Sequence, residues 1–288
     1  MNYFVKQFAS FIGFILLAGW CFGQQVKEPN PIPTDWERPY TPFRIVGNLY
    51  YVGTYDLACY LITTPQGHVL INTGVASSAK QIEHNIRSLG FKMSDLKVLL
   101  TTQAHYDHLG AMAQIKKITS ALLMANEADK PAIEDGGKSD YAFGGDVATF
   151  QPVKVGRILK DGDSVRCGNQ TIQMLHHPGH TKGSCSFLFS VKDGSKTYRV
   201  LIANMPSIVI EGKLDSIAGY SSISKDYAYT FDAMKSLTFD IWLASHASQF
   251  KLHSKRKPGD EYNPAAFVDR AGYDALLSDL QLEYNQRK

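Results

Sequence analysis

The sequence predicts an α+β sandwich, in which two sheets pack face to face and helices cover the outside. Three observations predict it: residues 43–72 read as a run of strands, residues 155–203 read as a second run, and helical periodicity follows each. We expect one domain over residues 24–288, because no repeat, low-complexity tract or Gly/Ser linker divides this stretch.

The N-terminus has the composition of a secretory signal peptide. Lys6 is followed by an uncharged apolar segment from Phe8 to Gly23 that ends near small residues. This segment is shorter than the roughly 18 residues expected of a membrane-spanning helix. Trp20 precedes Cys21, where a lipid-attachment pattern requires a small residue. We therefore expect residues 1–23 to be a signal peptide, and the mature chain to be periplasmic and free of membrane.

The composition excludes several classes of protein. With 30 Lys+Arg against 27 Asp+Glu, the formal charge is only +3, which argues against a nucleic-acid binder. A hydrophobic content of 44% is enough for a sizeable core. Four cysteines are too few for a disulfide scaffold. The mature chain keeps Cys59, Cys167 and Cys185, so at least one thiol is unpaired, or all three are free and buried.

The elements follow in order from periodicity and turn residues. In the first half we expect strands within 43–72, a helix at 77–89, a doubly buried strand at 96–101, helices at 110–118 and 126–135, and a glycine-rich loop at 136–145. In the second half we expect strands at 155–159, 164–167, 171–176, 185–191 and 198–203, a helix at 224–236, the strand IWLAS, and a terminal helix that opens at Asn263.

Chemistry-bearing residues are dense directly after the strand at 96–101. The segment TTQAHYDHLG supplies Gln103, His105, Asp107 and His108. Alternate positions after a strand point the same way, so we expect the first three to converge and a tight turn to add His108. Histidine and aspartate at this density are typical zinc ligands. The alternative is a polar loop in which Asp107 merely caps a helix.

Two later strands end in further histidines. HHPGHTKGS supplies His180, and IWLASHAS supplies His246. We regard His176 and His177 as weaker candidates that pack or form hydrogen bonds, and we expect His68, His84 and His253 to lie on the surface. The strong candidates form two sets of three, and sites that leave a position open for water favour hydrolysis.

The order QAHYDH, GHTKGS and SH resembles the metallo-β-lactamase superfamily, whose usual first motif is H-x-H-x-D-H. The resemblance extends over nearly all of the mature chain. It is strongest to class B β-lactamases of the third subclass, in the GOB-type group that has Gln in place of the first His. Supporting segments are VLINTG, GGKSDY, LIANMPS, KDYAYTF and DIWLASHASQF.

This resemblance implies an αββα sandwich of two mixed sheets and a zinc enzyme that hydrolyses the β-lactam ring of penicillins, cephalosporins and carbapenems, conferring antibiotic resistance. It implies a first zinc site at Gln103, His105 and His180 and a second at Asp107, His108 and His246. Because an amide oxygen is a poorer donor than imidazole, we expect the Gln103 site to be weaker, with one or two ions bound in total.

The implied mechanism has metal-bound hydroxide attacking the lactam carbonyl, with Asp107 as the catalytic residue that orients it. Ser207, Tyr55 and Tyr141 are candidate substrate contacts, and Trp36 and Phe143 are candidate walls of the cleft, although packing explains these aromatics equally well. We expect a monomer whose partner is a small-molecule β-lactam.

Two alternatives remain from the sequence. One is another exported hydrolase of this superfamily, such as a lactonase or phosphodiesterase. The glyoxalase II type places a bridging Asp where this chain has Asn204, which disfavours that type. The other is a zinc-binding module without catalytic activity.

Overall fold

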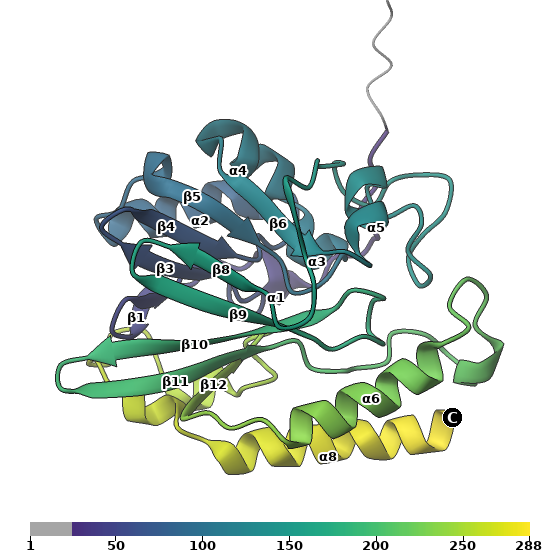
Figure 1. Cartoon of the computed structure of the whole chain (residues 1–288). Helices are drawn as coiled ribbons and strands as arrows, with labels where there is room; N and C mark the ends of the chain where they lie inside the picture. The colour runs from purple at the N-terminus through teal and green to yellow at the C-terminus, as the bar shows by residue number, and fades with distance from the viewer. Residues whose placement is uncertain (1–24) are drawn as a thin grey trace, which may run out of the picture.

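The computed structural model describes residues 25–288, which form two β-sheets stacked between helices (Figure 1). The first sheet has seven strands in sequence order. They are β1 (Phe43–Val46), β2 (Leu49–Tyr51), β3 (Tyr60–Thr64), β4 (Gly67–Ile71), β5 (Leu96–Leu100), β6 (Leu122–Asn126) and β7 (Arg157–Leu159). Strands β1 to β4 pair antiparallel and β4 to β7 pair parallel.

The second sheet has five strands in the order β12-β11-β10-β9-β8. They are β8 (Ser164–Cys167), β9 (Gln170–His176), β10 (Cys185–Asp193), β11 (Lys196–Ala203) and β12 (Ile241–Ala244). Strands β8 to β11 are antiparallel and β11 pairs parallel with β12, so β9, β11 and β12 end at the same edge of the sheet.

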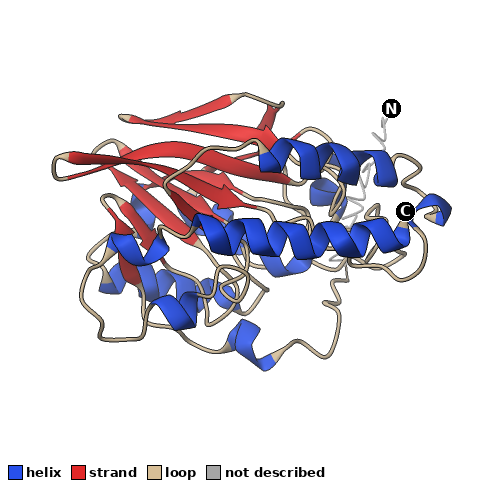
Figure 2. Cartoon of the chain, turned by 90° about the horizontal axis from the view of Figure 1, so that it is seen from below, coloured by secondary structure: helices blue, strands red, loops and turns tan. Residues whose placement is uncertain are grey.

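The helices cover the outer faces of the two sheets. They are α1 (Thr34–Glu37), α2 (Ser78–Ser88), α3 (Tyr106–Leu109), α4 (Met112–Thr119), α5 (Lys130–Asp135), α6 (Ile223–Lys235), α7 (Leu252–Lys255) and α8 (Arg270–Arg287). Helices α2 and α4 lie over the first sheet, while the long helices α6 and α8 lie side by side over the second (Figures 1 and 2). Short 3₁₀ turns are present at Met93–Asp95, Leu214–Ser216 and Pro264–Phe267.

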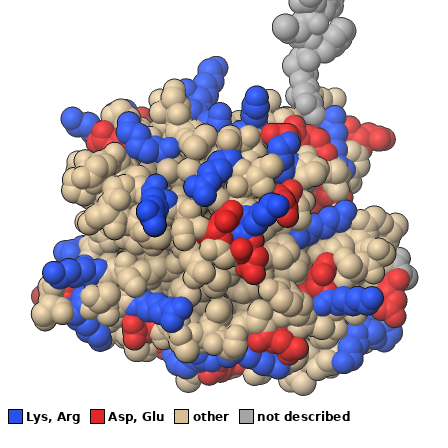
Figure 3. Space-filling view, viewed as in Figure 1, with Lys and Arg blue, Asp and Glu red and all other residues tan. Residues whose placement is uncertain are grey.

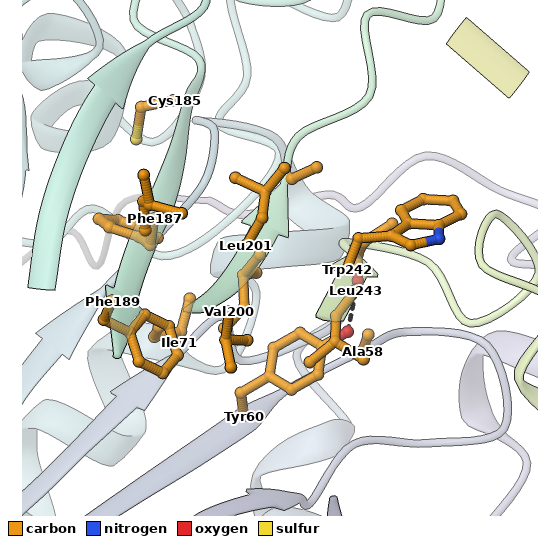
Figure 4. Packing of buried hydrophobic residues seen from close by; sticks show 14 of the residues in the cluster. Ala58, Tyr60, Ile71, Cys185, Phe187, Phe189, Val200, Leu201, Trp242 and Leu243 are labelled. Carbon is orange, nitrogen blue, oxygen red and sulfur yellow. Dashed lines mark hydrogen bonds between the residues drawn. The ribbon is translucent and has the colours of Figure 1, made fainter. Parts of the chain in front are cut away.

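The main core fills the space between the sheets. Phe187 and Val200 from the second sheet and Tyr60 from the first are all at most 1% exposed (Figure 4). The Tyr60 hydroxyl donates to the carbonyl of Ala244 at 2.6 Å, which satisfies a polar group that burial would otherwise penalise. This bond joins the two sheets close to the end of β12.

The sandwich prediction is confirmed, and most strands and helices lie where periodicity placed them. Strand β6 (Leu122–Asn126) is not among the expected strands, and the helix expected at 126–135 begins only at Lys130. The prediction that the terminal helix opens at Asn263 is wrong. The Asn263 side chain instead accepts a hydrogen bond from the Ala265 N–H and begins a 3₁₀ turn. Helix α8 starts at Arg270 after Asp269, whose carboxylate accepts from the Gly272 N–H.

Cys59, Cys167 and Cys185 are free and buried, which is one of the two states expected from the sequence. The predicted signal peptide, residues 1–23, lies outside the described residues. Among residues 25–288, no helix is long and apolar enough to span a bilayer. On the face shown in Figure 3, basic and acidic side chains are interspersed rather than segregated.

Candidate metal centre

The first part of the site follows β5, whose end at Leu100 leads into residues 101–109. Gln103, His105, Asp107 and His108 are all buried there. The expectation that Asp107 continues an extended alternation is wrong, because Tyr106–Leu109 form the short helix α3. His108 Nε2 therefore lies 3.1 Å from the neighbouring Asp107 Oδ2. The backbone fixes this turn, since the Thr73 N–H donates to the His108 carbonyl at 2.9 Å.

His246 joins this pair from the other sheet. It follows β12, and its Nε2 lies 3.4 Å from Asp107 Oδ2. Ligand atoms of Asp107, His108 and His246 all lie within 4.8 Å of one another, which is close enough to share one metal ion. The structure thus brings together the three residues that the sequence assigned to the second zinc site.

His180 lies beside His105, with ring centroids 4.9 Å apart. It is delivered by the loop between β9 and β10, which Asp129 supports by accepting from Thr181 Oγ1 and the Gly183 N–H, both at 2.7 Å. Gln103 is 2% exposed. The three residues of the predicted first site are therefore all buried at this end of the sandwich, and two of them are in contact.

Three histidines have one ring nitrogen near an oxygen, within hydrogen-bond distance for His246 and His180 and at ion-pair distance for His105. His246 Nδ1 lies 3.0 Å from Asp56 Oδ2, His180 Nδ1 lies 2.7 Å from the Ser207 carbonyl, and His105 Nε2 lies 3.4 Å from Asp140 Oδ2. Such partners orient histidines that bind metal. Sequence analysis missed Asp56 and Asp140, because both lie in loops and nothing near them in the sequence links them to a histidine.

The electrostatics differ across the site. Burial, together with the nearby His105, lowers the pKa of His180 to about 3. Burial also lowers the pKa of His246, but hydrogen bonds to Asp107 and Asp56 outweigh it and raise the pKa to about 9. Although burial alone would raise it, the contacts with His108 and His246 hold the pKa of Asp107 well below its usual range. Carboxylates and imidazoles in this cluster therefore favour each other's charged forms.

The site has the donors that a metal ion needs. Gln103 Oε1, His105 Nε2 and His108 Nε2 are buried and make no hydrogen bond, and buried polar atoms without a partner call for an explanation such as a bound ion. Imidazole, carboxylate and amide oxygen without thiolate suit zinc among the common metals. The residues present therefore fit a zinc centre.

Aromatic side chains surround these donors. The Trp36 ring lies 5.6 Å from the His246 ring, and the Phe143 ring lies 4.9 Å from the His105 ring. Tyr141, a candidate substrate contact, has protein partners: its hydroxyl donates to the carbonyls of Gly179 and His180 at 3.1 Å.

Tyr55 and Ser207, the other candidate substrate contacts, also have protein partners. The Tyr55 ring stacks on His253 at 3.7 Å and lies under the Arg38 guanidinium. Ser207 Oγ lies 3.2 Å from His180 Nδ1, so this residue contacts the site. Ser207 therefore lies beside the metal centre, and its role as a substrate contact stays a prediction.

The remaining histidines divide into two groups. His176 and His177 form hydrogen bonds with Asn126 and Ser186, as expected for residues that do not bind metal. The expectation that His68 lies on the surface is wrong, because it is 8% exposed on β4 and packs edge-on against Phe91.

Two sheets with outer helices thus carry, where their strands end, a cluster of side chains that could hold a metal ion. Residues 53–193 match the family model of the metallo-beta-lactamase superfamily. The chain belongs to this superfamily, as the solved structures also show.

One similar structure is the class B3 di-zinc metallo-beta-lactamase LRA-12 from an Alaskan soil metagenome. It is 63% identical with a TM-score of 0.90, and the match covers 91% of this chain and 99% of that one. Another is the metallo-beta-lactamase GOB-18 from Elizabethkingia meningoseptica, at 55% identity and a TM-score of 0.91, covering 92% and 98%. The predicted resemblance to the third subclass and its GOB-type group is confirmed.

Curated relatives are more distant. The hydroxyacylglutathione hydrolase GloC of Haemophilus influenzae is 29% identical over 132 residues, which is 45% of this chain. The chain spans 61% of the length of that relative, and 61% of an uncharacterized Aquifex aeolicus protein that is 30% identical.

Proposed function

We propose that this protein hydrolyses the β-lactam ring of penicillins, cephalosporins and carbapenems in a zinc-dependent reaction. The observation that carries the proposal is the buried cluster of Asp107, His108 and His246, with His105 and His180 beside it. The full-length similarity to class B3 enzymes supports the substrate class.

The residues that would hold zinc fall into two subsites. Gln103, His105 and His180 form the first, and Asp107, His108 and His246 form the second. Because the Gln103 amide is neutral and a poor donor, the first subsite binds zinc more weakly, so the ratio is one or two ions per chain.

When bound, zinc supplies a Lewis acid that polarises a carbonyl and lowers the pKa of water to about 7. The protein supplies the rest. Asp107 remains ionised at neutral pH, because its pKa is held well below its usual range, so its carboxylate accepts a hydrogen bond from the attacking water and orients it. Trp36 and Phe143 pack against His246 and His105 and would form the walls of the cleft beside the reacting carbonyl.

Thioester hydrolysis is the second candidate, because several curated relatives are hydroxyacylglutathione hydrolases. Asn204 speaks against it. This buried amide replaces the carboxylate expected there and accepts a hydrogen bond from Ser245 Oγ at 3.2 Å. Assays with lactone and phosphodiester substrates separate a lactonase or a phosphodiesterase, and a module without activity would turn over none of these substrates.

The proposal includes export to the periplasm through the signal peptide at residues 1–23, and a monomer as the working form. Expression of the chain with and without residues 1–23, followed by fractionation, tests the first. Export of the shortened chain would contradict the signal-peptide assignment.

The test of function is hydrolysis of nitrocefin, a penicillin and a carbapenem by the purified protein, with S-lactoylglutathione as the thioester control. We expect β-lactam turnover that is lost on dialysis against a strong chelator and restored by zinc. Turnover that survives chelation, or that is faster on the thioester, would overturn the proposal.

A further inference from the structure

The two nitrogens of the His246 ring face two different carboxylates. Nε2 lies 3.4 Å from Asp107 Oδ2, within the cluster that could share a metal ion. Nδ1 lies 3.0 Å from Oδ2 of Asp56, which is not part of that cluster. The Asp56 and His246 side chains are only 15% and 18% exposed, so solvent competes little for the bond between them.

Asp56 is fixed by the backbone, independently of the imidazole. It lies between β2 and β3 in the first sheet, and its Oδ1 accepts from the Ser248 N–H at 2.8 Å. Its own carbonyl accepts from the Ala247 N–H at 2.7 Å, and Leu57 forms an antiparallel bridge with His246. These backbone contacts fix the position of Asp56 Oδ2 without any contribution from the His246 ring.

A carboxylate only accepts hydrogen bonds, so the short contact requires a proton on His246 Nδ1. A neutral imidazole carries one N–H, and the other nitrogen then has its lone pair free to bind metal. Here that other nitrogen is Nε2, which faces Asp107. The partner of one nitrogen therefore selects the ligand atom at the other.

We propose that Asp56 is a positioning residue that holds a proton on Nδ1 of His246, so that Nε2 is the nitrogen available to the metal, and that it thereby sets the zinc affinity of the subsite formed by Asp107, His108 and His246. This inference rests on the zinc dependence in the proposed function. The two oxygens of Asp56 have separate roles: Oδ1 accepts a hydrogen bond from the Ser248 N–H, and Oδ2 orients the His246 ring.

Because the two oxygens of Asp56 have different partners, one substitution can remove the contact with His246 and keep the contact with Ser248. Asp56→Asn keeps an oxygen for the Ser248 N–H but turns an amide donor toward His246 Nδ1, which moves the imidazole proton to Nε2. The matched control is Asp240→Asn, at the opposite end of β12, where the carboxylate also accepts a backbone N–H, from Arg199 at 2.7 Å. Both changes remove one negative charge, but only the first affects a histidine.

The experiment is a competition titration of the zinc-free proteins with zinc and a chromophoric chelator, which resolves the affinity of each subsite. We expect Asp56→Asn to weaken one of the two zinc sites by about 10–100-fold and to leave the other unchanged, while Asp240→Asn matches the wild type. In a His246→Ala background, Asp56→Asn should have no further effect on zinc binding.

Wild-type affinity at both sites in Asp56→Asn would overturn the inference. So would equal weakening of both sites with a lower melting temperature, because that is the mark of general destabilisation. Nitrocefin hydrolysis by the wild type is measured in parallel. If the wild type binds zinc without hydrolysing nitrocefin, the proposed function fails while the titration still decides the role of Asp56.

Discussion

The two loops that deliver His180 and His246 are held by different kinds of contact. In residues 176–184, the carboxylate of Asp129 accepts from Thr181 and Gly183, but the His180 ring itself lies against the neutral carbonyl of Ser207. In residues 245–248, the carboxylate of Asp56 contacts both the backbone and the His246 ring.

This difference sets the charge of the two histidines. The pKa of His180 is lowered to about 3 by burial and by the nearby His105, whereas two carboxylates raise the pKa of His246 to about 9. The cluster of Asp107, His108 and His246 is therefore called the ionic subsite, because its carboxylate contacts both imidazoles, whereas the His180 ring lies against a neutral carbonyl. Zinc binding to His246 must therefore displace a proton, and zinc binding to His180 need not.

The largest effect should come from removing the charge at the centre of the ionic subsite. Asp107→Asn should lower kcat for nitrocefin by about 10²–10⁴-fold, because the amide neither orients water as a carboxylate does nor balances two histidines. Steady-state kinetics measure this, with Asp279→Asn on the exposed face of α8 as control. Wild-type turnover would show that the ionic subsite is dispensable.

Acid should lower the unfolding free energy through His177, in the loop of residues 176–184. Burial lowers the pKa of His177 to about 4, so the neutral form is favoured in the folded state. Stability from this group is complete above the unfolded pKa near 6.5, and it falls as pH drops from 6.5 to 4, by about 3 kcal/mol in all. Urea unfolding of zinc-free protein across this range should show a steep loss that His177→Asn reduces; equal slopes would contradict the assignment.

A smaller effect is expected at Tyr141. Tyr141→Phe removes the hydroxyl that donates to Gly179 and His180, which should cost about 1 kcal/mol of unfolding free energy. Zinc content should not change, because the ring remains packed on Tyr220. A rise in KM with unchanged stability would instead make Tyr141 a substrate contact, as the sequence suggested.

The smallest effect is expected at the first subsite, where Gln103 is the weak zinc donor. Gln103→His replaces an amide oxygen with imidazole and should raise zinc occupancy of the first subsite, without altering the Asp107 cluster. Metal analysis after gel filtration at limiting zinc measures it. An unchanged zinc-to-protein ratio would mean that Gln103 does not limit binding.

Much of the fold was predictable because its signals are local. Strand alternation and turn glycines located the sheets, and the spacing of Gln103, His105, Asp107 and His108 after a buried strand indicated metal ligands. Where competing local signals were close in strength, prediction failed. Asn263 can cap a 3₁₀ turn as well as an α-helix, and the residues after His105 can form a helical turn as well as an extended segment.

The sequence by itself determined the layers of the sandwich, the positions of the metal-binding residue types and the absence of thiolate among them. Only the tertiary structure decided which ring nitrogen of each histidine is free. That choice depends on partners such as Asp56 for His246, 190 positions apart in the chain, and on the neutral carbonyl beside His180. Hydrogen bonds between segments so distant in sequence exist only once two sheets have packed, so no local pattern encodes them.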